Sequence, residues 1–140
     1  MSVPASPASE PLRPLLVRAV AQALMAIFYE KQYADKVIEA ALKQNPKAGS
    51  RDRAFIAETT YEVVRNFRLY TELLGHSPNF EPDFWALVGI HFLVRHIPVH
   101  ADTDSPVISA LPNWREFQQL NPERIFRKAA ELRTIRKIRE

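Results

Sequence analysis

Apolar residues at helical spacing constrain the fold of this chain more than any other feature. The run consists of Ile56, Thr59, Val63, Phe67, Tyr70 and Leu74, at steps of three or four residues. An α-helix turns about 100° per residue, so these side chains form one stripe on a single helix. Ser50 stands where an N-cap is expected, and Gly75 where a helix stops. The pattern predicts one long helix that ends at Leu74.

Helical patterns fill the rest of the chain as well. They cover 15–31, 33–44, 81–97, a short piece after Pro112 with Trp114 and Phe117, and a last helix from Pro122. The helix over 81–97 is apolar all round, which is typical of a central helix. No segment alternates as a strand does. We therefore predict an all-α bundle of five to seven helices.

The composition excludes several classes of function. The chain has no Cys, which removes disulfides, thiolate metal sites and Cys nucleophiles. Its three glycines, Gly49, Gly75 and Gly89, are too far apart for a dinucleotide fingerprint or a P-loop. The apolar runs 19–29 and 84–94 fall short of the ~18 residues of a membrane span. No signal peptide is evident, so we expect a cytoplasmic protein without a membrane partner.

No catalytic or metal site is predicted. His91 and His96 point away from each other on a helix, and Pro98 separates His96 from His100. His91 is expected to be a hydrogen-bonded core residue. Glu58 and Glu62 are one turn apart, but they share a face with arginines, which is typical of a solvated and compensated surface.

Charge and proline content divide the chain into three parts. Residues 1–13 are a Pro/Ser-rich leader that we expect to be disordered. Residues 14–120 form the helical body. Residues 121–140 carry seven basic and three acidic side chains, whereas the rest of the chain is nearly neutral. This final basic helix is predicted to connect to a further domain.

Two groups of basic residues are candidates for RNA binding, because Arg and Lys bind phosphates. The first group surrounds the long helix and comprises Lys47, Arg51, Arg53, Arg65 and Arg68. The second lies in the last helix and comprises Arg124, Arg127 and Lys128. Each has another interpretation. Acidic neighbours can make the first group a salt-bridged surface, and the last helix can dock on another domain.

The segment from Gly49 to Glu58 resembles the NusB-like domain that precedes the catalytic domain in the Fmu/Sun (RsmB-like) family of tRNA and rRNA cytosine-C5 methyltransferases. The motif is Arg51-Asp52-Arg53 at a helix start, followed by Tyr61 and Arg65 in that helix. The segment 33–38 fits the preceding helix of this family. The resemblance extends from about residue 15 to residue 74.

The resemblance implies an all-helical NusB fold that helps to recognise ribosomal RNA. It also implies S-adenosylmethionine binding and catalysis in a later domain, which we expect to be absent from this chain. The chain alone would then hold no cofactor and would not be an enzyme. Asp52 has a structural interpretation too, since a first-turn carboxylate can pair with a neighbouring Arg and fix the preceding loop. Ser50 and Tyr61 are assigned structural roles with it.

Other functions stay open at this point. The chain can be a helical docking module whose partner is its own methyltransferase domain or a ribosomal protein, with the apolar stripe Ile125, Ala129, Leu132 and Ile135 as the contact. It can also be a free-standing NusB-type antitermination factor.

Overall fold

The computed structural model describes residues 12–95, 112 and 114–139, with side chains up to residue 132 in the last helix. This part of the chain is all-helical, as predicted, and contains no strand. Its elements are α1 (Pro14–Phe28), α2 (Ala34–Gln44), α3 (Ser50–Arg65), α4 (Phe67–Leu74), α5 (Glu81–Arg95), the 3₁₀ turn η2 (Arg115–Phe117) and α7 (Pro122–Arg139).

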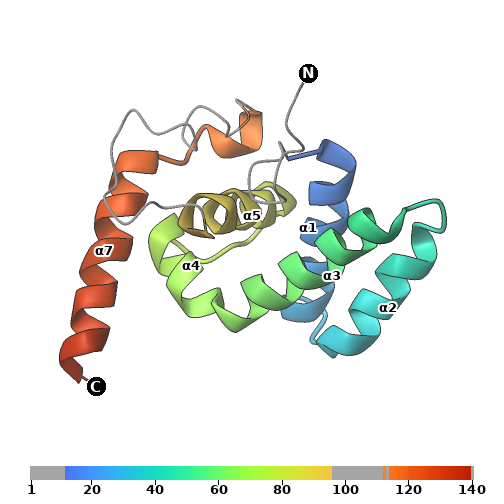
Figure 1. Ribbon diagram of the computed structural model, residues 1–140, viewed down its shortest axis with the longest axis horizontal. Coiled ribbons are helices and arrows are strands. Elements are labelled where there is room, and N and C mark those ends of the chain that lie inside the picture. Colours follow the sequence, from blue (N-terminus) through green and yellow to red (C-terminus); the bar gives the residue numbers. More distant parts are fainter. Residues whose placement is uncertain (1–11, 96–111, 113, 140) are drawn as a thin grey trace.

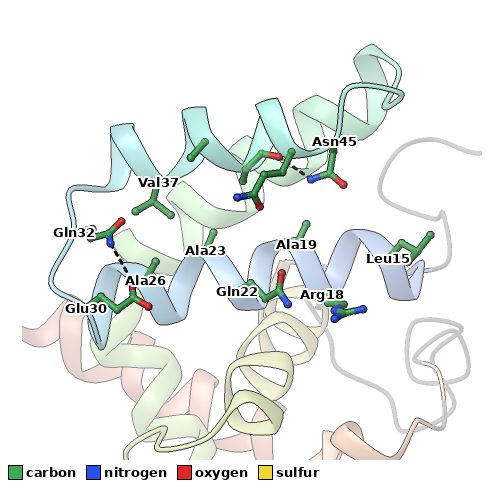
Figure 2. Close-up of a pocket in the computed structure, with 13 residues that line it drawn as sticks. Leu15, Arg18, Ala19, Gln22, Ala23, Ala26, Glu30, Gln32, Val37 and Asn45 are labelled. Carbon is green, nitrogen blue, oxygen red and sulfur yellow. Dashed lines mark hydrogen bonds between the residues drawn. The ribbon is translucent and has the colours of Figure 1, made fainter.

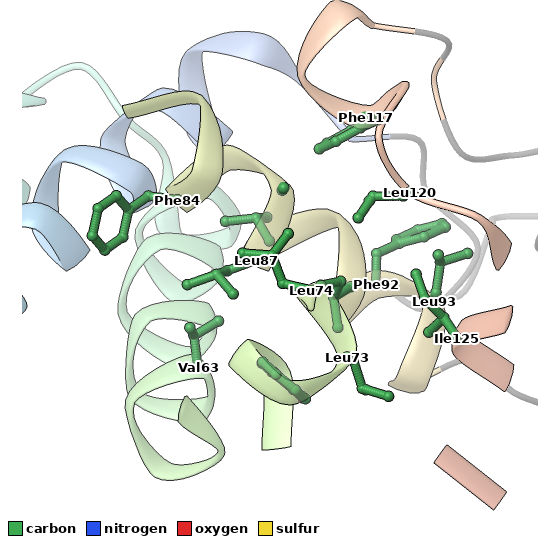
Figure 3. Close-up of a cluster of buried hydrophobic side chains, with 14 of the residues drawn as sticks. Val63, Leu73, Leu74, Phe84, Leu87, Phe92, Leu93, Phe117, Leu120 and Ile125 are labelled. Carbon is green, nitrogen blue, oxygen red and sulfur yellow. The ribbon is translucent and has the colours of Figure 1, made fainter. Parts of the chain in front are cut away.

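Helix α5 lies at the centre of the bundle (Figure 1). It packs against α1, α3, α4, α7 and η2, while α2 packs on α1 and α3 at one side. The core around α5 includes Phe84, Leu87 and Leu93 (Figure 3), all essentially inaccessible to solvent. The prediction of a central helix here is confirmed, because a helix that is apolar all round must be covered on every side.

Gly89 lets the turn at η2 approach α5 closely. A Cβ at this position would lie 2.8 Å from Cε1 of Phe117 and 2.9 Å from Cδ1 of Leu120. Phe117 also stacks on Trp114, with ring centroids 5.2 Å apart. The predicted short helix after Pro112 is therefore only a 3₁₀ turn, held by its apolar side chains on α5.

Helices α1 and α2 lie close to the ranges 15–31 and 33–44 that the sequence predicts. Pro14 occupies the first turn of α1, where its missing N–H is not needed. The helix ends at Phe28, three residues earlier than predicted, because Lys31 adopts a left-handed conformation (φ 58). The N–H of Gln32 then donates to the carbonyl of Ala26, 3.2 Å away.

Of the predicted leader, residues 1–11 lie outside the described part, and Leu12 is buried in the core.

The prediction of one continuous helix up to Leu74 is wrong. The helix is interrupted at Asn66 (φ −107, ψ 22). This residue ends α3 and begins α4. Its side-chain amide donates to the carbonyl of Glu62, 2.8 Å away. Asn favours such local bonds over regular helix. After the break Phe67 stacks on Phe28, with ring centroids 3.7 Å apart.

The buried stripe survives this break. Ile56 and Val63 are fully buried on α3, and Tyr70 is buried on α4. Gly75 is left-handed (φ 97) and ends α4 as predicted. At the other end Gly49, and not Ser50, takes the N-cap position, and Ser50 is the first helical residue. The helix thus starts one residue before the start that the capping pattern predicts.

Helix α7 begins at the predicted Asn-Pro pair. The Oδ1 atom of Asn121 accepts the N–H of Arg124 at 3.2 Å. Ile125 and Ala129 are buried with the rest of the core, and Leu132 packs against it. The side chain of Ile135 and the predicted apolar piece at 107–111 lie outside the described residues. The C-terminal end of α7 projects away from the other helices (Figure 1).

Candidate nucleic-acid interface

Asp52 pairs with an arginine that the sequence did not indicate. Its two carboxylate oxygens accept bonds from Nη1 and Nη2 of Arg13, at 3.1 and 3.0 Å. The expected partner was a neighbouring arginine of the motif. Arg13 instead comes from the segment before α1, because the packing of α1 on α3 brings the two residues together. The motif aspartate therefore fastens the start of α1 to the start of α3.

Two other motif residues hold α2 against α3. Nη1 of Arg53 donates to the carbonyl of Leu42 at 3.3 Å, near the carboxyl end of α2. The hydroxyl of Tyr61 donates to the carboxylate of Asp35 in the first turn of α2. This bond raises the pKa of Tyr61. Asp52, Arg53 and Tyr61 together thus connect α3 with both helices that precede it.

The first basic group is spread along the outer surface rather than gathered in one patch. Arg51 and Arg65 lie at opposite ends of α3, about 20 Å apart at the rise of an α-helix. Nη1 of Arg65 lies 3.3 Å from Oε1 of Glu62, and the Arg65 side chain is 74% exposed. Lys47 precedes α3 and Arg68 follows the break on α4, and both are exposed.

The second basic group is partly engaged within the bundle. Nη1 of Arg124 donates to the carbonyl of Leu73 at 3.3 Å, beside the end of α4. Arg127 is exposed, and Lys128 is half-buried. The buried side of the same helix is covered by this chain's own core at Ile125 and Ala129. Ile125 and Ala129 of the apolar stripe are therefore not available to a docking partner.

A cavity lies where α3, α4, α5 and α7 meet, with a volume of about 440 Å³. Its polar lining residues are Glu62, Asn66, Tyr70, His91 and Arg95. Sequence reasoning missed this site, because the residues come from separate helices. One sequence signal pointed toward it, which is a histidine inside the most apolar helix.

The floor of this cavity is a buried pair. The hydroxyl of Tyr70 lies 2.8 Å from Nδ1 of His91, and both side chains are buried. His91 is thus a hydrogen-bonded core residue, as predicted. Burial and, to a smaller extent, the nearby carboxylate of Glu62 raise the pKa of Tyr70, Arg95 opposes them, and the net result is a pKa of about 12. The negative charge of Glu62 and the positive charge of Arg95 therefore both act on the Tyr70 hydroxyl in this cavity.

A second hollow, of about 490 Å³, lies between α1 and α2 (Figure 2). Its walls include Ala19, Ala23 and Ala26 of α1, whose small side chains leave the space open. Gln32 donates to Glu30 at one end, 2.9 Å away. The hollow collects no group of basic side chains, so it is not a candidate for phosphate contact.

No three potential metal ligands gather among the described residues. His96 and His100 lie outside that part of the chain. None of the helices described is long and apolar enough to cross a membrane.

The chain matches no protein-family model, and no curated protein or solved structure matches it significantly.

Proposed function

We propose that this chain is a non-catalytic helical domain that binds ribosomal RNA and positions it for an S-adenosylmethionine-dependent cytosine-C5 methyltransferase domain. The methyltransferase assignment depends on the resemblance around Arg51-Asp52-Arg53. The RNA-binding assignment also has physical support, which comes from the exposure of the basic side chains.

The observation that carries the proposal is that the arginines of the motif helix keep their charge at the surface while they serve the fold. Arg53 and Arg65 each use one nitrogen in a bond within the chain. A guanidinium group has five N–H donors, so most of them remain for phosphate oxygens. A structural role for the motif is therefore compatible with phosphate contact.

The distribution of these cations suits an extended strand better than a compact ligand. Arg51, Arg65 and Arg68 follow the outer side of α3 and α4, with the charges separated along the helix axis. Successive phosphates of a single strand are likewise separated in space. Binding by such contacts is sequence-independent and falls with salt.

The test compares the affinities of the unmodified protein, a triple variant and a matched control variant for a fluorescent single-stranded fragment of ribosomal RNA. The triple variant Arg51→Ala, Arg65→Ala, Arg68→Ala removes three positive charges. It keeps Arg53, so the bond from Arg53 to the carbonyl of Leu42 is retained. Each lost phosphate contact makes the negative slope of log affinity against log salt shallower by about 0.7 for single strands, so the magnitude of the slope should fall by about 2.

The matched control removes three other exposed cations, Arg18, Lys36 and Lys43, and leaves the net charge the same as in the triple variant. It should keep the slope of the unmodified protein. Equal slopes in the triple variant and the control would overturn the proposed interface. A circular dichroism melt of each variant shows whether the fold is intact.

A further inference from the structure

The cavity among α3, α4, α5 and α7 combines apolar walls with hydrogen-bonding groups of both kinds. Leu69, Val94 and Leu132 provide apolar surface. Glu62 offers a carboxylate and Arg95 a guanidinium in the same lining. Small-molecule sites are typically built this way, from an apolar cavity with a few convergent polar groups.

The two charged groups are available to a ligand. Only the Oε1 atom of Glu62 is bonded within the described part of the chain, to Arg65, which leaves Oε2 as an acceptor. Arg95 has no ion pair among the described residues, and it is exposed at the end of α5. Asn66 uses its Nδ2 on the carbonyl of Glu62, so its amide oxygen remains as a second acceptor.

This set of groups complements a nucleobase that has both an amino group and a carbonyl. Carboxylates accept hydrogen bonds from the amino group of cytosine, and arginine donates to base carbonyl and ring-nitrogen acceptors. Cytosine and guanine have both features, whereas uracil has no amino group. The volume of about 440 Å³ falls within the usual range of ligand sites and leaves room for one base and its sugar.

Basic side chains stand beside the cavity on two helices. Arg65 of α3 pairs with the lining residue Glu62. Arg95 of α5 lines the cavity itself. A phosphate attached to a base in the cavity would thus meet cations from different elements. Unstacked bases of single-stranded RNA are the usual targets of base-specific protein contacts.

We propose that this cavity binds one unstacked cytosine or guanine of single-stranded RNA, with Glu62 accepting from the amino group and Arg95 donating to the carbonyl. The inference rests on the proposed RNA-binding function and adds base selectivity to it. Phosphate contacts along α3 and α4 supply affinity, and the cavity distinguishes the base.

The experiment compares a short oligouridine with the same oligonucleotide carrying one central cytosine or guanine, by fluorescence anisotropy at low salt. The unmodified protein should prefer the cytosine- or guanine-containing strand about tenfold, the discrimination typical of one well-formed base contact. Glu62→Gln should remove this preference, because the neutral amide accepts the amino group more weakly. Leu132→Trp should also remove it by filling the cavity.

Glu58→Gln is the control, since it removes the same charge from α3 one turn earlier and outside the cavity. It should keep the preference. A preference that persists in Glu62→Gln overturns the base site, even if Leu132→Trp fails to fold, and leaves general RNA binding intact. Free cytidine or guanosine monophosphate that binds as tightly as the oligonucleotide overturns the RNA assignment of the cavity. No binding of any RNA overturns both proposals.

Discussion

The buried pair of Tyr70 and His91 provides a sharp test of the structure, through the variant Tyr70→Phe. The substitution removes a hydroxyl that lies 2.8 Å from Nδ1 of a buried imidazole. Leaving a buried polar atom without its partner costs about 1–3 kcal/mol. The ring itself stays, so no cavity is created. We therefore expect Tyr70→Phe to lower the free energy of unfolding by about 1–3 kcal/mol near neutral pH.

The same variant should respond differently to high pH. Tyr70 ionises at about 12 in the folded protein, against an ordinary value of 10.0. Above 10.0 the unfolded chain loses this proton while the folded chain keeps it, so the stability of the unmodified protein falls as the pH rises. One pH unit in this window corresponds to about 1.4 kcal/mol where the unfolded chain is fully ionised and the folded chain fully protonated, and partial titration of both states lowers this to about 1 kcal/mol.

Tyr70→Phe lacks this titration, so its deficit relative to the unmodified protein should shrink by about 1 kcal/mol over that pH unit. Urea unfolding of both proteins, followed by circular dichroism from neutral to alkaline pH, measures the difference. Other tyrosines and lysines titrate in both proteins and cancel. A deficit that stays constant with pH, or grows, would refute the assignment of Tyr70 as a buried residue with a raised pKa.

Three further substitutions test a close contact, a backbone conformation and an ion pair. Gly89→Ala should lower the melting temperature, because overpacking against Phe117 typically costs about 1–3 kcal/mol and offsets the gain of about 1 kcal/mol in helix propensity; an unchanged or higher melting temperature would contradict the close approach of Phe117. Gly75→Ala should cost about 1–2 kcal/mol in urea unfolding, because its φ of 97 is left-handed; a gain in stability would contradict this conformation. Asp52→Asn should cost about 1 kcal/mol or less, since its pair with Arg13 is partly exposed; a double-mutant cycle with Arg13→Ala that shows no coupling would mean that the pair does not form in solution.

The helical class and the central helix could be predicted, because periodic apolar residues determine which face of each segment is buried. The stripe from Ile56 to Leu74 is buried as predicted, although the helix is not continuous. The break at Asn66 was not predicted, since the apolar spacing continues through it. The bond that competes with regular helix comes from the side-chain amide of Asn66 to the carbonyl of Glu62. The stacking of Phe67 on Phe28 is a tertiary contact.

The site was less predictable than the fold. Sequence reasoning gave Asp52 a structural role, but the partner, Arg13, is 39 residues away and only the packing of α1 on α3 brings it close. The cavity depends on four helices meeting, and pairs such as Glu62 and Arg95 have no sequence spacing that relates them. The burial of His91 could be predicted because it stands inside an apolar helix.

The salt dependence of RNA binding by the unmodified protein tests the central claim most directly. A fluorescent single-stranded ribosomal RNA fragment is titrated with the protein at several salt concentrations. The proposed function predicts saturable binding whose log affinity falls linearly with log salt, at a slope of about −0.7 for each phosphate contacted. Binding that is absent at low salt, or that does not change with salt, would contradict it.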